Sequence, residues 1–217
     1  MALTDRKKIS FGREPFNGYS HLIGAAASVV GGIVLIEQAL GNPLLVIACA
    51  IYAVSLFLAF FSSALFHLVS GPPELCRRLR DFDHYCIGGL IMGTYAPLAV
   101  QMLPWAWALA CLVYLITVAT VSAVVTSRRR GEISRSKLSS WYIGMATLSL
   151  FSVPFCWADF WQPILWIAFG SLFYITGAVC YLAKIPRRSM WLNFHEVWHI
   201  FVMIGAFIHY QVILWLV

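Results

Sequence analysis

Long apolar stretches alternate with short polar ones along almost the whole chain. After a polar start at residues 1–18, seven apolar stretches follow, each long enough to cross roughly 30 Å of hydrocarbon as a helix. They occupy residues 19–40, 43–68, 82–102, 105–126, 139–157, 161–182 and 194–216. Glycine or proline interrupts some of them, which membrane helices tolerate where neighbours satisfy the freed backbone groups. The pattern predicts an all-α, polytopic membrane protein built as a seven-transmembrane helix bundle.

The composition supports a membrane protein with one domain. Apolar residues make up 61% of the chain and charged residues only 11%, whereas soluble domains carry about 25% charged residues. There is no internal repeat, low-complexity tract or long linker, so we expect a single transmembrane domain over residues 1–217. The six cysteines are scattered without a CxxC pair, which favours reduced apolar fillers over disulfides or thiolate metal ligands.

The positive charges predict the orientation of the bundle. All 15 Lys and Arg residues lie before the first stretch or in alternate loops, namely those after the second, fourth and sixth stretches. The other loops, near residues 41–43, 101–105 and 158–163, contain none. By the positive-inside rule the N-terminus is cytoplasmic and the C-terminus lies on the far side. The net charge of +6 therefore does not indicate a nucleic-acid partner.

Four predicted helices bring polar side chains to the same cytoplasmic depth. The second helix ends at His67, the third begins near Asp83, the seventh begins with His195 and His199, and the first contains His21. Ionisable residues inside membrane spans are costly and usually face the bundle interior or a cavity. We therefore expect these residues to share one polar site.

Three of these histidines predict a zinc site. His195 and His199 are four residues apart and lie on one helix face, and His67 supplies a third imidazole. Three protein ligands leave the fourth position open for water, as in catalytic zinc sites. Three imidazoles with an open position favour Zn²⁺ over other metals.

Asp83 and Ser63 are the candidate catalytic residues. Asp83 could hold the water or take its proton, or it could simply start the third helix, where an acidic residue is favourable. Ser63 lies one turn before His67 on the same face and could contact a ligand or the water. Serine is also common at helix contacts in membranes, which is the alternative role for Ser63.

Five further polar residues are candidates for lining the cavity or supporting the ligands: Asn17, His21, His84, Glu196 and His209. His21 and His84 could instead be packing residues near the membrane interface. His209 lies on roughly the same face as His195 but about 15 Å deeper than His199, so it cannot bind the same ion.

Residues 195–199 also read as HExxH, the zinc-protease motif in which the glutamate acts as general base. Intramembrane metalloproteases place this motif before an aspartate on a later helix. Here the motif lies on the last helix and the third histidine precedes it. We therefore expect the protease interpretation to be wrong.

Several motifs together resemble a known family. The segments Ser63–His67, Phe82–Ile87 with its continuation through residues 91–97, and His195–His199 are similar in sequence and order to bacterial hemolysin III proteins. Those proteins belong with the progestin and adiponectin Q receptors and, more distantly, with alkaline ceramidases. Residues Glu14, Asn17 and His21 also match the first-helix pattern of the bacterial branch.

The resemblance extends over the whole chain and carries specific implications. It implies seven helices in a bacterial inner membrane, with a cytoplasmic N-terminus and a periplasmic C-terminus. It also implies zinc bound near the cytoplasmic face by His67, His195 and His199, with Asp83 positioning the water and Ser63 close by. The receptor branch has glutamine in place of Glu196, so the resemblance carries no base role to that residue.

The function expected from these features is hydrolysis of a lipid amide or ester in membrane lipid homeostasis. The partners would be membrane lipids or a lipid-like substrate, with no obligate protein partner. The main alternative is a membrane sensor or homeostasis protein in which zinc is structural. A cytolytic pore-former is a weaker alternative, because we expect no cleaved signal peptide and see no amphipathic release segment.

Overall fold

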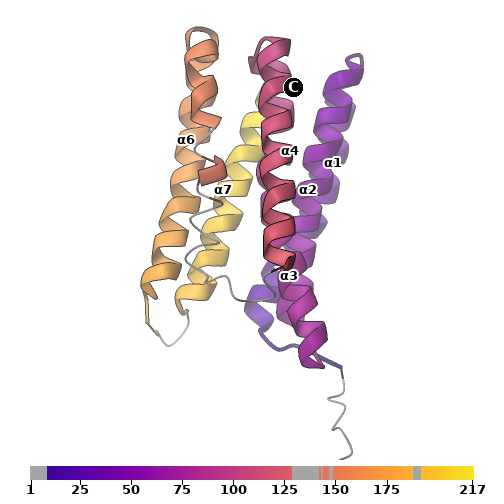
Figure 1. Cartoon of the computed structure of the whole chain (residues 1–217), viewed down its shortest axis with the longest axis vertical. Helices are drawn as coiled ribbons and strands as arrows, with labels where there is room; N and C mark the ends of the chain where they lie inside the picture. The colour runs from indigo at the N-terminus through magenta and orange to yellow at the C-terminus, as the bar shows by residue number, and fades with distance from the viewer. Residues whose placement is uncertain (1–8, 129–141, 143, 147–148, 188–191) are drawn as a thin grey trace, which may run out of the picture.

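The computed structural model describes residues 9–128, 142, 144–146, 149–187 and 192–217 (Figure 1). These residues form long helices and one pair of two-residue strands. The elements in chain order are β1 (Ser10–Phe11), α1 (Pro15–Gln38), α2 (Pro43–Leu68), β2 (Val69–Ser70), α3 (Pro73–Met102), α4 (Trp105–Arg128), the 3-10 helix η1 (Ser149–Ser152), α6 (Val153–Ala183) and α7 (Phe194–Leu216).

The predicted boundaries agree best for the second and seventh stretches, which coincide with α2 and α7. The first helix begins at Pro15 rather than at residue 19, because proline suits the first turn of a helix. The predicted stretch 105–126 corresponds to α4, which continues to Arg128.

The fifth predicted stretch, 139–157, is described only in part, because residues 139–141, 143 and 147–148 lie outside the described residues. Its last part comprises η1 and residues 153–157, which form the beginning of α6. The backbone of Phe160 is not helical, with φ −128° and ψ 26°. Two helices therefore meet at Phe160, and this break coincides with the predicted one between the fifth and sixth stretches.

The third helix is longer than predicted, because it begins at Pro73 and not at residue 82. Its first turns are polar and make their own ion pairs. The Glu74 carboxylate pairs with Arg77 three residues later and with Arg78 four residues later, the latter at 2.9 Å. Such pairs stabilise a helix in water, so a hydrophobicity pattern alone misses these turns.

Apolar side chains cover the outside of the bundle as well as its core. In the part of the chain that the structure describes, α1, α2, α6 and α7 are long and apolar enough to span a membrane. Large apolar side chains such as Ile23, Val30 and Phe207 are more than 60% exposed. A helix that is apolar all round belongs in lipid, so this is a multi-pass membrane protein.

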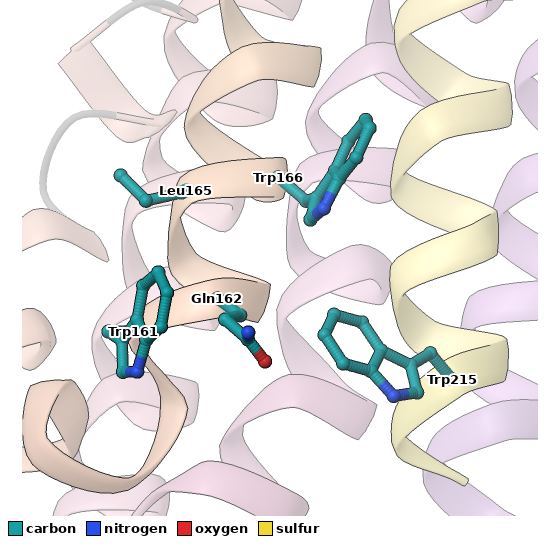
Figure 2. A pocket seen from close by; sticks show the side chains of 5 residues that line it. All are labelled: Trp161, Gln162, Leu165, Trp166 and Trp215. Atoms are coloured by element: carbon teal, nitrogen blue, oxygen red, sulfur yellow. The ribbon is translucent and has the colours of Figure 1, made fainter.

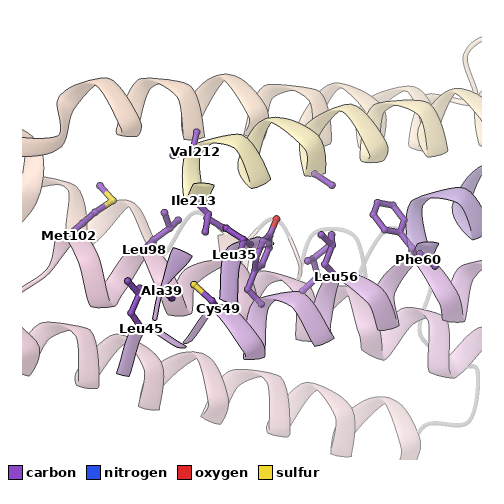
Figure 3. Packing of buried hydrophobic residues seen from close by; sticks show 14 of the residues in the cluster. Leu35, Ala39, Leu45, Cys49, Leu56, Phe60, Leu98, Met102, Val212 and Ile213 are labelled. Carbon is purple, nitrogen blue, oxygen red and sulfur yellow. The ribbon is translucent and has the colours of Figure 1, made fainter. Parts of the chain in front are cut away.

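The buried core joins α1, α2, α3 and α7. Leu35, Cys49, Tyr52 and Ile213 are each at most 1% exposed and lie in one continuous cluster (Figure 3). Helix α7 packs mainly against α6, and it also contacts α1 and α3. The start of α1, the end of α2 and the starts of α3 and α7 consequently lie at the same end of the bundle (Figure 1).

Tryptophans lie at the opposite end. Trp161, Trp166 and Trp215 line a shallow groove between α6 and α7, together with Gln162 and Leu165 (Figure 2). The three indoles are each about half exposed. Tryptophan is enriched at the membrane–water interface, and this groove fits that setting.

Close helix contact at Gly93 gives a test of the packing of α3 on α2. A Cβ atom at Gly93 would lie 1.9 Å from Ser55 Oγ and 3.3 Å from the backbone oxygen of Ile51. We expect Gly93→Ala to lower the free energy of unfolding by about 1–3 kcal/mol through overpacking. Thermal unfolding of the purified protein in detergent micelles measures this change.

The matched control is Gly89→Ala on the same helix. A Cβ atom at Gly89 meets nothing within 4 Å, and alanine is the better helix former by roughly 1 kcal/mol. Gly89→Ala should therefore be neutral or slightly stabilising. Equal melting temperatures for the two variants would contradict the close α2–α3 approach.

Candidate metal centre

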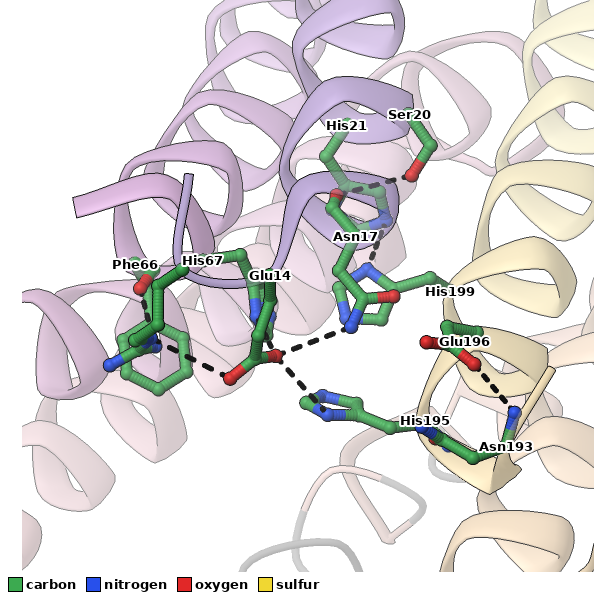
Figure 4. Close-up of polar contacts among 11 residues, drawn as sticks. Glu14, Asn17, Ser20, His21, Phe66, His67, Asn193, His195, Glu196 and His199 are labelled. Carbon is green, nitrogen blue, oxygen red and sulfur yellow. Dashed lines mark hydrogen bonds and ion pairs between the residues drawn. The ribbon is translucent and has the colours of Figure 1, made fainter. Parts of the chain in front are cut away.

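Three histidines from two helices form a compact cluster. His67 lies in the last turn of α2, and His195 and His199 lie in the first two turns of α7. One ligand nitrogen from each imidazole lies within 4.8 Å of the other two. His67 and His199 are each 1% exposed, and His195 is partly exposed. Figure 4 shows His67, His195 and His199 grouped around the start of α1.

The glutamate immediately before α1 forms a hydrogen bond with one of the imidazoles. Glu14 Oε2 lies 2.8 Å from His67 Nδ1, 3.3 Å from Asn17 Nδ2 and 3.8 Å from His195 Nδ1 (Figure 4). Chiefly because of the hydrogen bond with His67, the pKa of Glu14 is lowered to about 2. Glu14 is therefore a carboxylate that accepts hydrogen bonds from the polar residues around it.

A second histidine pair lies deeper in the bundle. His21 on α1 is 4% exposed, and its Nε2 is 2.8 Å from His199 Nδ1. The other nitrogen of His199, Nε2, is buried and has no hydrogen-bond partner among the described residues. A buried polar atom without a partner is costly, and a metal ion is a partner that fits this nitrogen.

The three imidazoles fit a zinc ion by chemistry and by spacing. Bonds of about 2.1 Å from zinc to nitrogen bring the ligand nitrogens of one ion within roughly 3–4 Å of each other. The observed set is only slightly wider. Three imidazoles leave a coordination position open, which is the arrangement of catalytic zinc sites.

Asp83 and Ser63 lie beside this cluster. Asp83 is on α3, is half-buried, and has the Ser63 side chain close to its carboxylate. Asp83 is also close enough to His67 to interact with it electrostatically. The neighbouring His84 receives a hydrogen bond of 2.6 Å at its backbone oxygen from the Tyr142 hydroxyl.

Glu196 has a structural partner. Its carboxylate accepts a hydrogen bond of 2.5 Å from the backbone N–H of Asn193, and the Asn193 side chain accepts one of 2.8 Å from the N–H of His195. This reciprocal arrangement is a capping box at the start of α7. The glutamate of the HExxH pattern therefore caps the helix that carries two of the histidines.

His209 lies away from the cluster, on the far part of α7. Its Nε2 donates a hydrogen bond of 3.0 Å to the backbone oxygen of Ile167 and lies 3.5 Å from Ser171 Oγ. A Cβ atom at Gly170 would lie 2.5 Å from the His209 ring. His209 therefore contributes to the packing of α7 on α6.

The contact of Glu14 with His67 was not predicted from the sequence. Glu14, Asn17 and His21 are spaced by three and then four residues, which places them along one face of a helix. That spacing was the available signal. It could not show which imidazole the carboxylate would reach, because the reach depends on where the end of α2 lies.

The chain is similar to known proteins over nearly its whole length. The family model described as "Haemolysin-III related" matches residues 9–210. Hemolysin-3 of Bacillus cereus is 29% identical over 196 residues, which cover 88% of this chain and 85% of that protein. A shorter similarity, 35% over 52 residues, relates 21% of this chain to 12% of the adiponectin receptor protein of Drosophila melanogaster. The chain belongs to the Haemolysin-III related family.

Proposed function

We propose that this protein is a zinc-dependent hydrolase that cleaves an amide or ester bond of a membrane lipid at the cytoplasmic face of a bacterial inner membrane. The observation that carries the proposal is the buried cluster of His67, His195 and His199, with its unpartnered His199 Nε2. Asp83 and Ser63 beside it add an acid–base group that a purely structural metal site does not need.

The proposed topology is one domain over residues 1–217 with seven membrane spans. Among the described residues, four helices are long and apolar enough to span a membrane. With the other three predicted spans, positively charged loops alternate with loops that carry no positive charge. In this topology the N-terminus and the histidine cluster are cytoplasmic and the C-terminus is periplasmic.

Each residue of the site has a separate role in the proposed reaction. His67, His195 and His199 hold the zinc ion, which when bound lowers the pKa of a water molecule and polarises a carbonyl group. Asp83 accepts the proton of the attacking water and returns it to the leaving group. Ser63 donates a hydrogen bond to the Asp83 carboxylate and keeps it oriented.

The proposed substrate follows from the position of the site. The cluster lies at the end of helices whose outer faces are apolar, so a substrate with acyl chains can reach it from the bilayer. The chemistry calls for no nucleic acid and no protein partner.

A second candidate function is a sensor or homeostasis protein in which zinc is structural. Helix α7 packs mainly on α6, and the histidine cluster joins its start to the end of α2. A metal ion there would tie the α6–α7 pair to the helices at the N-terminal side. A protease is disfavoured, because Glu196 is engaged in its capping box.

The topology predicts where a reporter enzyme is active. Alkaline phosphatase folds only outside the cytoplasm, so a fusion after Val217 should be active. A fusion after Lys184, in the loop before α7, should be inactive because that loop is cytoplasmic. Phosphatase activity in cells, normalised to the amount of fusion protein, measures both. An inactive C-terminal fusion beside an active loop fusion would reverse the proposed orientation.

The metal site predicts zinc in the purified protein. We expect about one zinc ion per chain by mass spectrometry, because three imidazoles supply a complete set of protein ligands. The double variant His195→Ala/His199→Ala should retain none, whereas His209→Asn should retain the wild-type amount. Metal-free wild-type protein after purification with added zinc and no chelator would refute the site.

The acid–base role predicts that Asp83→Asn abolishes turnover but leaves zinc bound. Removing a general base costs roughly 100- to 10,000-fold in rate. The measurement is fatty-acid release from ceramide and from phospholipids in mixed micelles, with zinc content determined on the same samples.

The hydrolysis experiment also separates the two candidate functions. If zinc-loaded wild-type protein releases no fatty acid while an alkaline ceramidase control is active, the hydrolase proposal fails. A large fall in melting temperature on adding chelator, together with no turnover, would then favour structural zinc.

A further inference from the structure

We propose that Glu14 and His21 are positioning residues that orient two of the metal ligands: Glu14 orients His67, and His21 orients His199. The inference rests on the proposed zinc site and extends it to the first helix. It assigns a role to two residues that do not themselves contact the metal.

The first contact sets the orientation of His67. The Glu14 carboxylate is 2.8 Å from Nδ1, so this nitrogen carries the proton and donates it in a hydrogen bond. The lone pair of the imidazole is then on Nε2, which is the nitrogen left for the metal. A carboxylate behind a histidine ligand fixes its ring and makes it more basic.

The second contact does the same for His199 through a neutral partner. His199 Nδ1 is 2.8 Å from His21 Nε2. When His199 binds a metal through its buried Nε2, its Nδ1 must carry the proton. His21 Nε2 then accepts the hydrogen bond from this N–H group. His21 would then carry its own proton on Nδ1, a buried atom with no partner among the described residues. The ring of His21 is held by an edge-on contact with Phe60, at a centroid distance of 5.2 Å.

The N-terminal segment keeps Glu14 in place. Strand β1 pairs antiparallel with β2, with Ser10 opposite Ser70. Beyond this pair, the N–H of Gly12 donates to the oxygen of Leu68 at 2.8 Å, and the N–H of Glu14 donates to the oxygen of His67 at 3.0 Å. The backbone of Glu14 is thus bonded to the same residue whose side chain its carboxylate orients.

Arg13 strengthens this attachment to the end of α2. Its guanidinium donates a hydrogen bond of 2.6 Å to the oxygen of Phe66 and lies 4.7 Å from the centre of the Phe66 ring. An arginine suits both a carbonyl at the end of a helix and an aromatic face. We refer to residues 10–14 as the N-terminal strap.

The test is the zinc affinity of strap and α1 variants, measured in detergent micelles by competition with a fluorescent chelator. We expect Glu14→Ala and His21→Leu each to weaken zinc binding about 10- to 100-fold, the usual effect of losing such a partner. Glu14→Gln and His21→Gln keep a side-chain oxygen that can accept a hydrogen bond from the histidine N–H, so each should recover part of the lost zinc affinity.

Two variants serve as matched controls. Glu37→Gln changes an exposed glutamate at the other end of α1, and His209→Gln changes a partly buried histidine outside the cluster. Both should bind zinc as the wild type does. The visible spectrum of Co²⁺ in place of zinc should change in Glu14→Ala and His21→Leu but not in the controls.

The melting temperature of the metal-free protein separates positioning from a structural role. For positioning residues, Glu14→Gln and His21→Gln keep the metal-free melting temperature while zinc affinity falls. If zinc affinity stays within about threefold of wild type and only the metal-free melting temperature falls, the inference is wrong. If the wild type itself binds neither zinc nor cobalt, the proposed site fails, and the inference fails with it.

Discussion

Burying imidazoles at the end of a membrane bundle is the constraint on which this structure depends. A buried polar atom must find a partner, and two contacts here supply one between separate parts of the chain. His67 reaches Glu14, and His199 reaches His21. These contacts bring the start of α1 to the end of α2 and the start of α7, so the arrangement of three helices and the geometry of the cluster are coupled. Two buried nitrogens, His21 Nδ1 and His199 Nε2, have no partner among the described residues, and a metal ion would satisfy the second.

Backbone features at the same end of the bundle hold this arrangement in place. The N-terminal strap pairs with β2 immediately after His67, so the direction in which the chain leaves α2 also determines where Glu14 lies. At the start of α7, the capping box of Asn193 and Glu196 determines where the helix begins, and hence the direction of His195 and His199. The three histidines thus lie in the last turn of α2 and the first two turns of α7, beside anchored backbone that leaves their side chains little freedom.

The sequence was sufficient for much of the fold and for the cluster of three histidines, and insufficient for the contacts that surround the cluster. The apolar stretches predict the first and last residues of α2 and α7, because proline or asparagine marks the start of each helix. They miss the first turns of α3, which are stabilised by Glu74 with Arg77 and Arg78 and not by lipid. Spacing predicts that His195 and His199 share a face. It cannot pair Glu14 with His67, because that contact depends on the crossing of α1 and α2 and on the strap.

The HExxH pattern shows why the surroundings of a motif decide its chemistry. The two histidines contribute to the metal cluster, but the glutamate between them is turned back onto the N-cap of its own helix. The hydrolysis that we propose would then need an acid–base group from another helix, and Asp83 with Ser63 is the pair that lies beside the imidazoles. A metal ion would stabilise the helix arrangement whether or not the protein is an enzyme, since it binds the folded state. Asp83 is different: it is not needed to join α2 to α7, so its chemistry, and not metal binding, distinguishes a hydrolase from a zinc-stabilised sensor.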